Sequence, residues 1–310
     1  GVTALGYVVE SRVLGQALYQ QLQQGAVTAF VPAKVFALEQ QPEFVAVNIE
    51  RDGLVETLKT RLLVVADGAQ SSLRELLGIA VKRHDYQQTA LIANVTTSAP
   101  HRNTAYERFT PQGPLALLPL TQGRYSLVWT HRTATLDATL QLSDADFLRK
   151  LQAEFGYRQG LFTNVGQRAT YPLVLQKAER EVAGRALLIG NASHALHPVA
   201  GQGLNLGLRD VATLVDLLAN AAHAGEDVGH AGLLQAYASQ RQADYANVIP
   251  YTDALVRLFS NDFTPLAHAR ATALLVVDRL PWLRHWLARQ NMGLRHSQAR
   301  LTRGLGLQAG

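Results

Sequence analysis

The residues best suited to chemistry lie in one glycine-rich segment, GNASHALHPVAGQGLNLG, which runs from Gly190 to Gly207. The apolar run before it predicts a buried strand ending at Ile189, and the residues after it predict a long helix ending near His223. Glycines such as Gly201 and Gly203 let the main chain approach a ligand where a Cβ atom would clash. The first N–H groups of the helix add a positive dipole end. The segment therefore predicts a site for a planar or anionic ligand.

Two other readings of this segment are weaker. Gly201 and Gly203 fit the start of a G-x-G-x-x-G dinucleotide fingerprint, but Leu206 stands where its third glycine should be. His194 and His197 have the H-x-x-H spacing of a zinc pair, yet no third ligand is evident nearby. We therefore predict no metal site and interpret both histidines as packed loop residues, with His194 kept as a candidate catalytic base.

A second motif, VVADGAQSSLR, covers Val64 to Arg74 and follows an apolar run that predicts a strand buried on both faces. Asp67-Gly68 alone is more often a turn at the end of a strand. Together, however, the two motifs resemble those of the FAD-dependent aromatic hydroxylases of the para-hydroxybenzoate hydroxylase type. That family has an A-D-G segment after a buried strand and a G-D-A-x-H-x-x-x-P-x-x-G-x-G-x-N loop against the flavin ring. The matching residues are Asp67, Gly68, Gly190, Pro198, Gly201, Gly203 and Asn205.

Within that family the chain is most similar to the ubiquinone-biosynthesis branch, which hydroxylates phenols of the 2-octaprenyl-6-methoxyphenol type. The branch-specific resemblance is strongest over Tyr106–Leu120 and Gly190–Asp210. It implies an FAD cofactor, NAD(P)H and O2 as co-substrates, and a hydrophobic prenylated phenol as substrate. It also implies participation in a complex of ubiquinone-biosynthesis enzymes.

The resemblance also assigns site residues. The implied cofactor-binding residues are Arg12, Asp67, Gly68, Gly190, Asn191, Pro198, Gly201, Gly203, Leu204 and Asn205, with Pro198 and His194 as catalytic candidates. Asn191 replaces the aspartate that accepts a ribityl hydroxyl in the family, and its amide oxygen can still accept that hydrogen bond. The pocket floor is expected to include Phe109, Leu115, Leu117 and Pro119.

The periodicity around these motifs predicts an α/β (α+β) fold. A partial Rossmann-like FAD-binding domain would cover residues 1–84 and 169–225, with a strand and a helix before Gly25. An inserted antiparallel substrate-binding sheet would cover 85–168, including a helix from Ser143 to Phe155 with Asp146 completing a capping box. A C-terminal helical region would cover 226–310.

The G-x-G-x-x-G segment that holds the FAD diphosphate in the family is not found in these 310 residues, and the first domain is expected to lack its first βαβ unit. Two hypotheses follow. The chain is a flavoprotein monooxygenase, or it is a truncated, non-catalytic homologue that binds prenylated phenols or scaffolds sibling enzymes.

The composition excludes some classes of site and partner. The absence of cysteine excludes disulfides and thiolate metal sites and favours the cytoplasm. Six arginines and no acidic residue follow position 278, and without them the net charge of +5 would fall to −1. This basic region predicts either a solvated helix end or peripheral contact with the inner membrane, and its Leu/Trp stripe at 280–287 predicts either a core or interface position or contact with lipid. Nothing in the sequence favours nucleic-acid binding.

Overall fold

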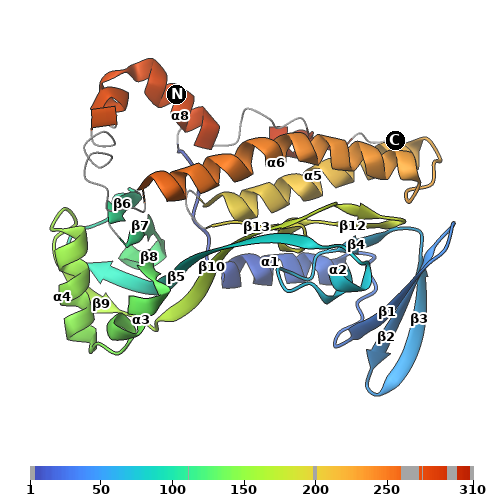
Figure 1. Cartoon of the computed structure of the whole chain (residues 1–310), viewed down its shortest axis with the longest axis horizontal. Helices are drawn as coiled ribbons and strands as arrows, with labels where there is room; N and C mark the ends of the chain where they lie inside the picture. The colour runs from blue at the N-terminus through green and yellow to red at the C-terminus, as the bar shows by residue number, and fades with distance from the viewer. Residues whose placement is uncertain are drawn as a thin grey trace. The chain divides into compact units, whose positions relative to one another are not determined.

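A computed structural model describes residues 4–110, 112–197, 201–259, 272–273, 275–291 and 299–307. The chain forms two compact units (Figure 1). The first unit contains residues 1–27, 85–173 and 253–292, and the second contains 28–84, 174–252 and 293–310. The break at 84/85 coincides with the predicted start of the inserted sheet. In contrast to the predicted division, residues 1–27 group with that sheet, and the C-terminal region is shared between both units.

The first unit is built on an antiparallel sheet, as predicted. Its strands are β5 (Val81–Thr97), β6 (Tyr106–Thr110), β7 (Gly113–Pro119), β8 (Arg124–Arg132), β9 (Phe162–Val165) and β10 (Ala169–Ala178). The full strand order is β13-β10-β5-β8-β7-β6, in which β13 (His194–Ala195) belongs to the second unit, and β9 also pairs with β5. Residues Gln88 to Thr96 of β5 pair continuously with Arg132 to Arg124 of β8. Strands β5 and β10 each continue along the chain into the second unit.

Two helices, α3 (Thr133–Leu140) and α4 (Asp144–Phe155), lie between β8 and β9 in the chain. Helix α4 begins at the predicted cap, where Ser143 Oγ accepts a hydrogen bond from Asp146 N. Phe147 and Leu151 of α4 pack with Leu115, Leu117 and Trp129 of the sheet in the main core of this unit. The expectation that Leu115 and Leu117 form a pocket floor is therefore wrong, because both side chains are fully buried in that core. Helices α1 (Ser11–Gln24) and α8 (Pro281–Asn291) also lie wholly in the first unit, and α1 has no buried residue.

The second unit contains two small sheets. Strands β1 (Lys34–Gln40), β2 (Val45–Arg51) and β3 (Leu54–Thr60) form an antiparallel meander. Strands β11 (Val182–Ala183), β12 (Ala186–Leu188) and β4 (Leu63–Val65) form the other sheet, in which β12 and β4 run parallel. β4 is an edge strand, so Val64 is 37% exposed and the predicted burial on both faces is wrong.

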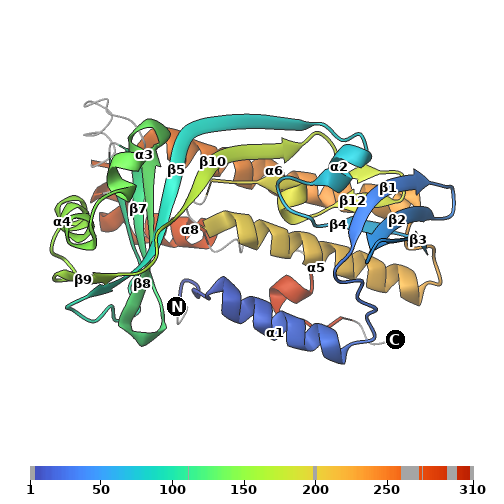
Figure 2. The same cartoon turned by 90° about the horizontal axis from the view of Figure 1, so that it is seen from below.

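Two long helices, α5 (Gln202–His223) and α6 (Ala231–Phe259), lie side by side over this part of the second unit (Figures 1 and 2). Leu214 and Ala221 of α5 pack with Leu234 and Tyr237 of α6 and with Leu187 of β12. The short elements α2 (Ser72–Leu76), η2 (Gly190–Ala192), β13 (His194–Ala195) and η4 (Leu301–Arg303) complete this unit. The core formed by α5 and α6 positions the start of α5, where the glycine-rich segment ends.

Candidate functional site

The glycine-rich segment leaves β12 through a tight turn and is fixed to neighbouring strands on both sides of it. Ile189 N donates to Val65 O at 3.0 Å before the turn. Gly190 then adopts a φ of +56°, a left-handed conformation that favours glycine. After the turn, His194 and Ala195 of β13 pair with Lys177 and Gln176 of β10. The turn at Gly190 is therefore a defined loop on a rigid frame.

The start of α5 offers an open surface made of backbone groups. Gly201 caps the helix with a φ of +59° and no side chain that accepts from the first N–H groups. A Cβ atom added at Gly201 or Gly203 would meet nothing within 4 Å. Next to them, Leu204 and Leu208 are 63% and 54% exposed. A helix N-terminus beside exposed apolar side chains suits a flat ligand that carries negative charge, so the residues present fit a flavin.

Arg74 joins the two sequence motifs. Its side chain is only 4% exposed, and it lies in α2, which begins after the Asp67-Gly68 turn. Its Nη1 donates to Ala192 O at 2.9 Å and its Nη2 donates to Ala69 O at 3.2 Å. The A-D-G segment and the glycine-rich loop, far apart in sequence, are thus held together by one buried guanidinium group.

Asp210 of α5 holds the glycine-rich loop through hydrogen bonds of its carboxylate. Its Oδ2 accepts hydrogen bonds from Gly190 N at 2.9 Å and from His194 Nε2 at 2.8 Å. Its Oδ1 accepts from Arg241 Nε at 2.7 Å and Tyr245 Oη at 2.8 Å, both on α6. Helix α5 lies close to the turn, since a Cβ atom added at Gly207 would stand 3.4 Å from Gly190 Cα, at van der Waals contact. All four partners donate, so Asp210 is best satisfied as a carboxylate.

Asp210 belongs to a buried cluster with Arg209, Arg241 and Asp244, whose formal charges cancel. Asp244 Oδ2 accepts from Arg209 Nε at 2.8 Å and from Arg241 Nη1 at 2.9 Å. Burial alone would raise the pKa of Asp210, but the hydrogen bond and charge of His194 and the charge of Arg241 outweigh it and hold that pKa below its ordinary value. Burial also raises the pKa of Tyr245 well above its ordinary value, which keeps this hydroxyl a donor.

The predicted cofactor residues divide between the two units. Asp67, Gly68, Gly190, Asn191, Gly201, Gly203, Leu204 and Asn205 all belong to the second unit, whereas exposed Arg12 belongs to the first. Pro198 lies outside the described residues. Asp67 Oδ2 accepts from Leu73 N at 3.2 Å, so this carboxylate caps α2. Asn191 is exposed and available to a ligand.

The two histidines of the segment are buried. His194 has no exposed surface and its Nε2 donates to Asp210, so it is placed to support the loop rather than to reach a substrate. Burial lowers the pKa of His197 to about 4, which keeps its ring neutral. Among the described residues, no three His, Asp or Glu side chains gather as a metal site would require.

The sequence motifs assign no role to six residues of this site, namely Arg74, Arg209, Asp210, Arg241, Asp244 and Tyr245. A signal existed: Asp210 sits one turn from buried Leu206 and Leu214, so a charge interrupts the apolar face of the helix. Arg241 interrupts the buried stripe of α6 in the same way, between Tyr237 and Tyr245. Charges at core-facing helix positions are paired when buried, and here they pair with each other.

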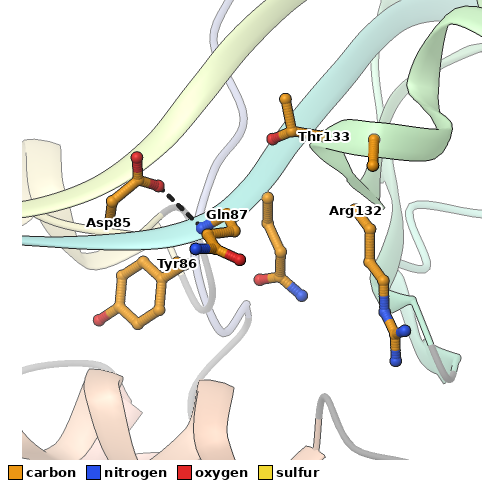
Figure 3. A pocket seen from close by; sticks show the side chains of 7 residues that line it. Asp85, Tyr86, Gln87, Arg132 and Thr133 are labelled. Atoms are coloured by element: carbon orange, nitrogen blue, oxygen red, sulfur yellow. Dashed lines mark hydrogen bonds between the residues drawn. The ribbon is translucent and has the colours of Figure 1, made fainter.

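The first unit contains a separate recess of about 580 Å³, lined by Asp85, Tyr86, Gln87, Gln88, Arg132, Thr133 and Ala134 (Figure 3). Tyr86 and Arg132 extend to the same side of strand β5 in this view. Asp85 Oδ1 accepts from Gln87 N at 2.8 Å, in a bend where Gln87 has a φ of +53°. The recess therefore combines an aromatic ring with groups of both charges.

The sequence of the chain is similar to that of known flavoproteins. A model of the FAD binding domain family matches residues 8–250. Ubiquinone hydroxylase UbiL of Rhodospirillum rubrum is 41% identical over 98% of this chain and 71% of its own length. The 3-demethoxyubiquinol 3-hydroxylase of Escherichia coli is 33% identical over 94% of this chain and 73% of its own.

Solved structures share the fold. The p-nitrophenol 4-monooxygenase PnpA from Pseudomonas putida superposes with a TM-score of 0.70 at 18% identity, covering 93% of this chain and 72% of PnpA. The anhydrotetracycline hydroxylase OxyS from Streptomyces rimosus gives 0.67 at 24% identity, and this chain spans 57% of that structure. Fold, site and relatives together define the class as flavoprotein monooxygenases that use FAD. Within that class, the chain belongs to the family of ubiquinone-biosynthesis hydroxylases.

Proposed function

We propose that this protein hydroxylates the ring of a polyprenylated phenol of the 2-octaprenyl-6-methoxyphenol type, using NAD(P)H and O2. The observation that carries the proposal is the open glycine surface at the start of α5, together with the Gly190 loop held by Arg74 and Asp210, in a chain 41% identical to a ubiquinone hydroxylase. Bound FAD would supply the activation of oxygen, which no protein side chain provides.

The chain's own groups would bind and orient the cofactor. The first N–H groups of α5, near Gly203, Leu204 and Asn205, would stabilise negative charge on the flavin ring. Exposed Asn191 would offer its amide oxygen to a hydroxyl of the cofactor. Leu204 and Leu208 would exclude water from the face that they cover.

The recess in the first unit is our candidate for the substrate ring. Its volume of about 580 Å³ lies within the usual range of small-molecule sites. The guanidinium of Arg132 would bind an oxygen substituent of the substrate ring, and Tyr86, whose hydroxyl donates to Asp253 Oδ1 at 2.8 Å, would contact the ring through its own aromatic face. The Arg132→Ala variant should therefore raise KM for the phenol about tenfold while kcat changes little. Arg149→Ala, an exposed arginine of α4 outside the recess, is the matched control, and equal KM values for both variants would contradict this location.

The function is tested with purified protein incubated with FAD, desalted, and scanned for visible absorption. Retained flavin bands, followed by phenol-dependent NAD(P)H oxidation and a product heavier by one oxygen atom, would support the proposal. Flavin retention without any hydroxylated product would contradict the proposed substrate class. A protein that binds prenylated phenols but retains no FAD would instead favour the non-catalytic alternative, a phenol-binding or scaffolding homologue.

We also propose that the protein lies in the cytoplasm and contacts the anionic inner face of the membrane, where a prenylated substrate resides. Among the described residues, no helix is long and apolar enough to span a bilayer. Trp282 and Trp286 of α8 are 67% and 46% exposed, with Arg279 and Arg284 nearby in the sequence. Indole rings and arginines are the side chains that favour a lipid interface.

Vesicle sedimentation tests this contact. Vesicles containing phosphatidylglycerol should bind the protein, and vesicles of phosphatidylcholine alone should bind it less. The W282A/W286A double variant should lose most of this binding, whereas Tyr157→Ala, which removes an aromatic ring 73% exposed elsewhere in the first unit, should not. Equal binding by both variants would place the contact elsewhere or contradict it.

A further inference from the structure

A cluster of four charged side chains lies beneath the glycine-rich loop, away from the surface that a ligand can reach. Arg209, Asp210, Arg241 and Asp244 are each less than a tenth exposed, and their formal charges cancel. Removing such groups from water costs about as much as their attraction returns, so well-packed apolar residues would stabilise this position equally well. The cluster is therefore poorly explained by stability alone.

Geometry gives the cluster a more specific role. One oxygen of Asp210 bonds to the loop, through Gly190 N and His194 Nε2, and the other bonds to α6, through Arg241 and Tyr245. Arg241 is itself oriented by Asp244, to which its Nη1 donates at 2.9 Å. The carboxylate is thus fixed by α6, and the turn at Gly190 is fixed by the carboxylate.

We propose that Asp210 is a positioning residue for FAD, whose carboxylate, clamped by Arg241 and Tyr245, holds the Gly190 turn in the conformation that receives the cofactor. Asp210 touches no cofactor atom itself, because its side chain has no exposed surface. The inference rests on the FAD site described above and extends it to α6, which the sequence motifs leave out.

Three variants distinguish a positioning role of Asp210 from a contribution to the stability of the folded protein alone. Asp210→Asn keeps the shape but loses the charge, and it leaves Arg241 partly uncompensated. The double variant D210N/R241Q removes both charges, so the remaining Arg209–Asp244 pair is still balanced. Asp227→Asn is the matched control: it removes the same charge from a less buried ion pair with Arg185 in the same unit. Melting temperature, hydrogen exchange of residues 186–197 in the cofactor-free protein, FAD affinity and the spectrum of bound FAD are measured for each.

We expect Asp210→Asn to accelerate hydrogen exchange at the Gly190 amide and to weaken FAD binding about tenfold or more. The double variant should recover most of the melting temperature yet keep the fast exchange, the weak binding and an altered flavin spectrum. Asp227→Asn should match the unmodified protein in exchange, affinity and spectrum.

Two results would overturn the proposal. One is a double variant whose loop exchange and FAD affinity return to normal together with its melting temperature, which would mean that only charge balance matters. The other is an Asp210→Asn variant with unchanged exchange at residues 186–197. An unmodified protein that binds no FAD would contradict the proposed function instead, and the exchange measurement would then decide the role of Asp210 in the loop by itself.

Discussion

Gly201 and Gly203 differ in backbone conformation although a Cβ atom would find open space at both. Gly201 has a φ of +59°, whereas Gly203 lies in the first turn of α5. Without FAD, Gly201→Ala should therefore destabilise the second unit by about 1–2 kcal/mol. Gly203→Ala should stabilise it by up to about 1 kcal/mol, because alanine is the better helix former.

The two variants should nevertheless agree in binding, since each adds a methyl group to the surface offered to the flavin. FAD affinity should fall about tenfold or more in both, measured by quenching of flavin fluorescence, while urea unfolding gives the opposite signs of stability. A Gly203→Ala protein that binds FAD normally would show that the cofactor does not approach this part of the helix.

The sequence motifs mark the residues that we propose to contact the cofactor, but not the residues that support them. Gly190, Gly201 and Gly203 stand out because their motif spacing reflects a local backbone requirement. Asp210 and Arg241 meet across two helices, and no local pattern specifies which pairs of buried charges will face each other. For His194 the motif marked the position, but its burial against Asp210 depends on the packing of α5 and became visible only in three dimensions.

Among the helices and strands, the sequence predicted best those helices that have a capping residue and those strands that pair with a strand nearby in the chain. The helix at 144–155 begins where Ser143 and Asp146 indicated, and antiparallel strands form between 85 and 132 as expected, with alternating burial over parts of β5 and β8. The strand predicted before α1, near Val8, is absent from the described structure: residues 4–10 are not paired. Alternation reports local preference, but a strand also needs a hydrogen-bonding neighbour, which a short sequence cannot reveal.

Substitution of Ser143 tests how much the N-cap of α4 contributes to the stability of the first unit. Ser143→Ala removes the acceptor of Asp146 N and should destabilise the first unit by about 1 kcal/mol in urea unfolding. Ser143→Asn retains a side-chain acceptor and should cost only a fraction of that. If both substitutions cost the same, the stability of this helix comes from its packed face, through Phe147 and Leu151, rather than from its cap.

For the whole molecule, buried neutral histidines determine the response to acid. Burial lowers the pKa of His197 to about 4, and burial together with Lys150 lowers that of His131 to about 4, from an ordinary 6.5. Below pH 6.5 the unfolded chain binds protons that the folded chain does not. The free energy of unfolding should therefore fall as the pH drops from 6.5 to about 4, by at most about 1.4 kcal/mol per pH unit for each histidine.

Urea unfolding at pH 7 and pH 5 tests whether His131 and His197 cause the loss of stability in acid. His197→Gln should flatten the pH dependence of the second unit, and His131→Gln should flatten that of the first. His285→Gln, which changes an exposed histidine of α8, should leave both profiles unchanged. Profiles that remain equally steep in all three variants would assign the acid sensitivity to carboxylates.

The link from Asp210 to α6 also has a consequence for synthesis of the protein. A chain leaves the ribosome from its N-terminus, so the glycine-rich loop emerges before Arg241 and Tyr245, which lie 31 and 35 residues beyond Asp210. Until α6 has emerged, Asp210 lacks both of its partners on that helix and should stay hydrated. Nascent chains stalled before α6 should therefore remain open to protease around residue 190, and the cofactor loop should become resistant only when α6 docks.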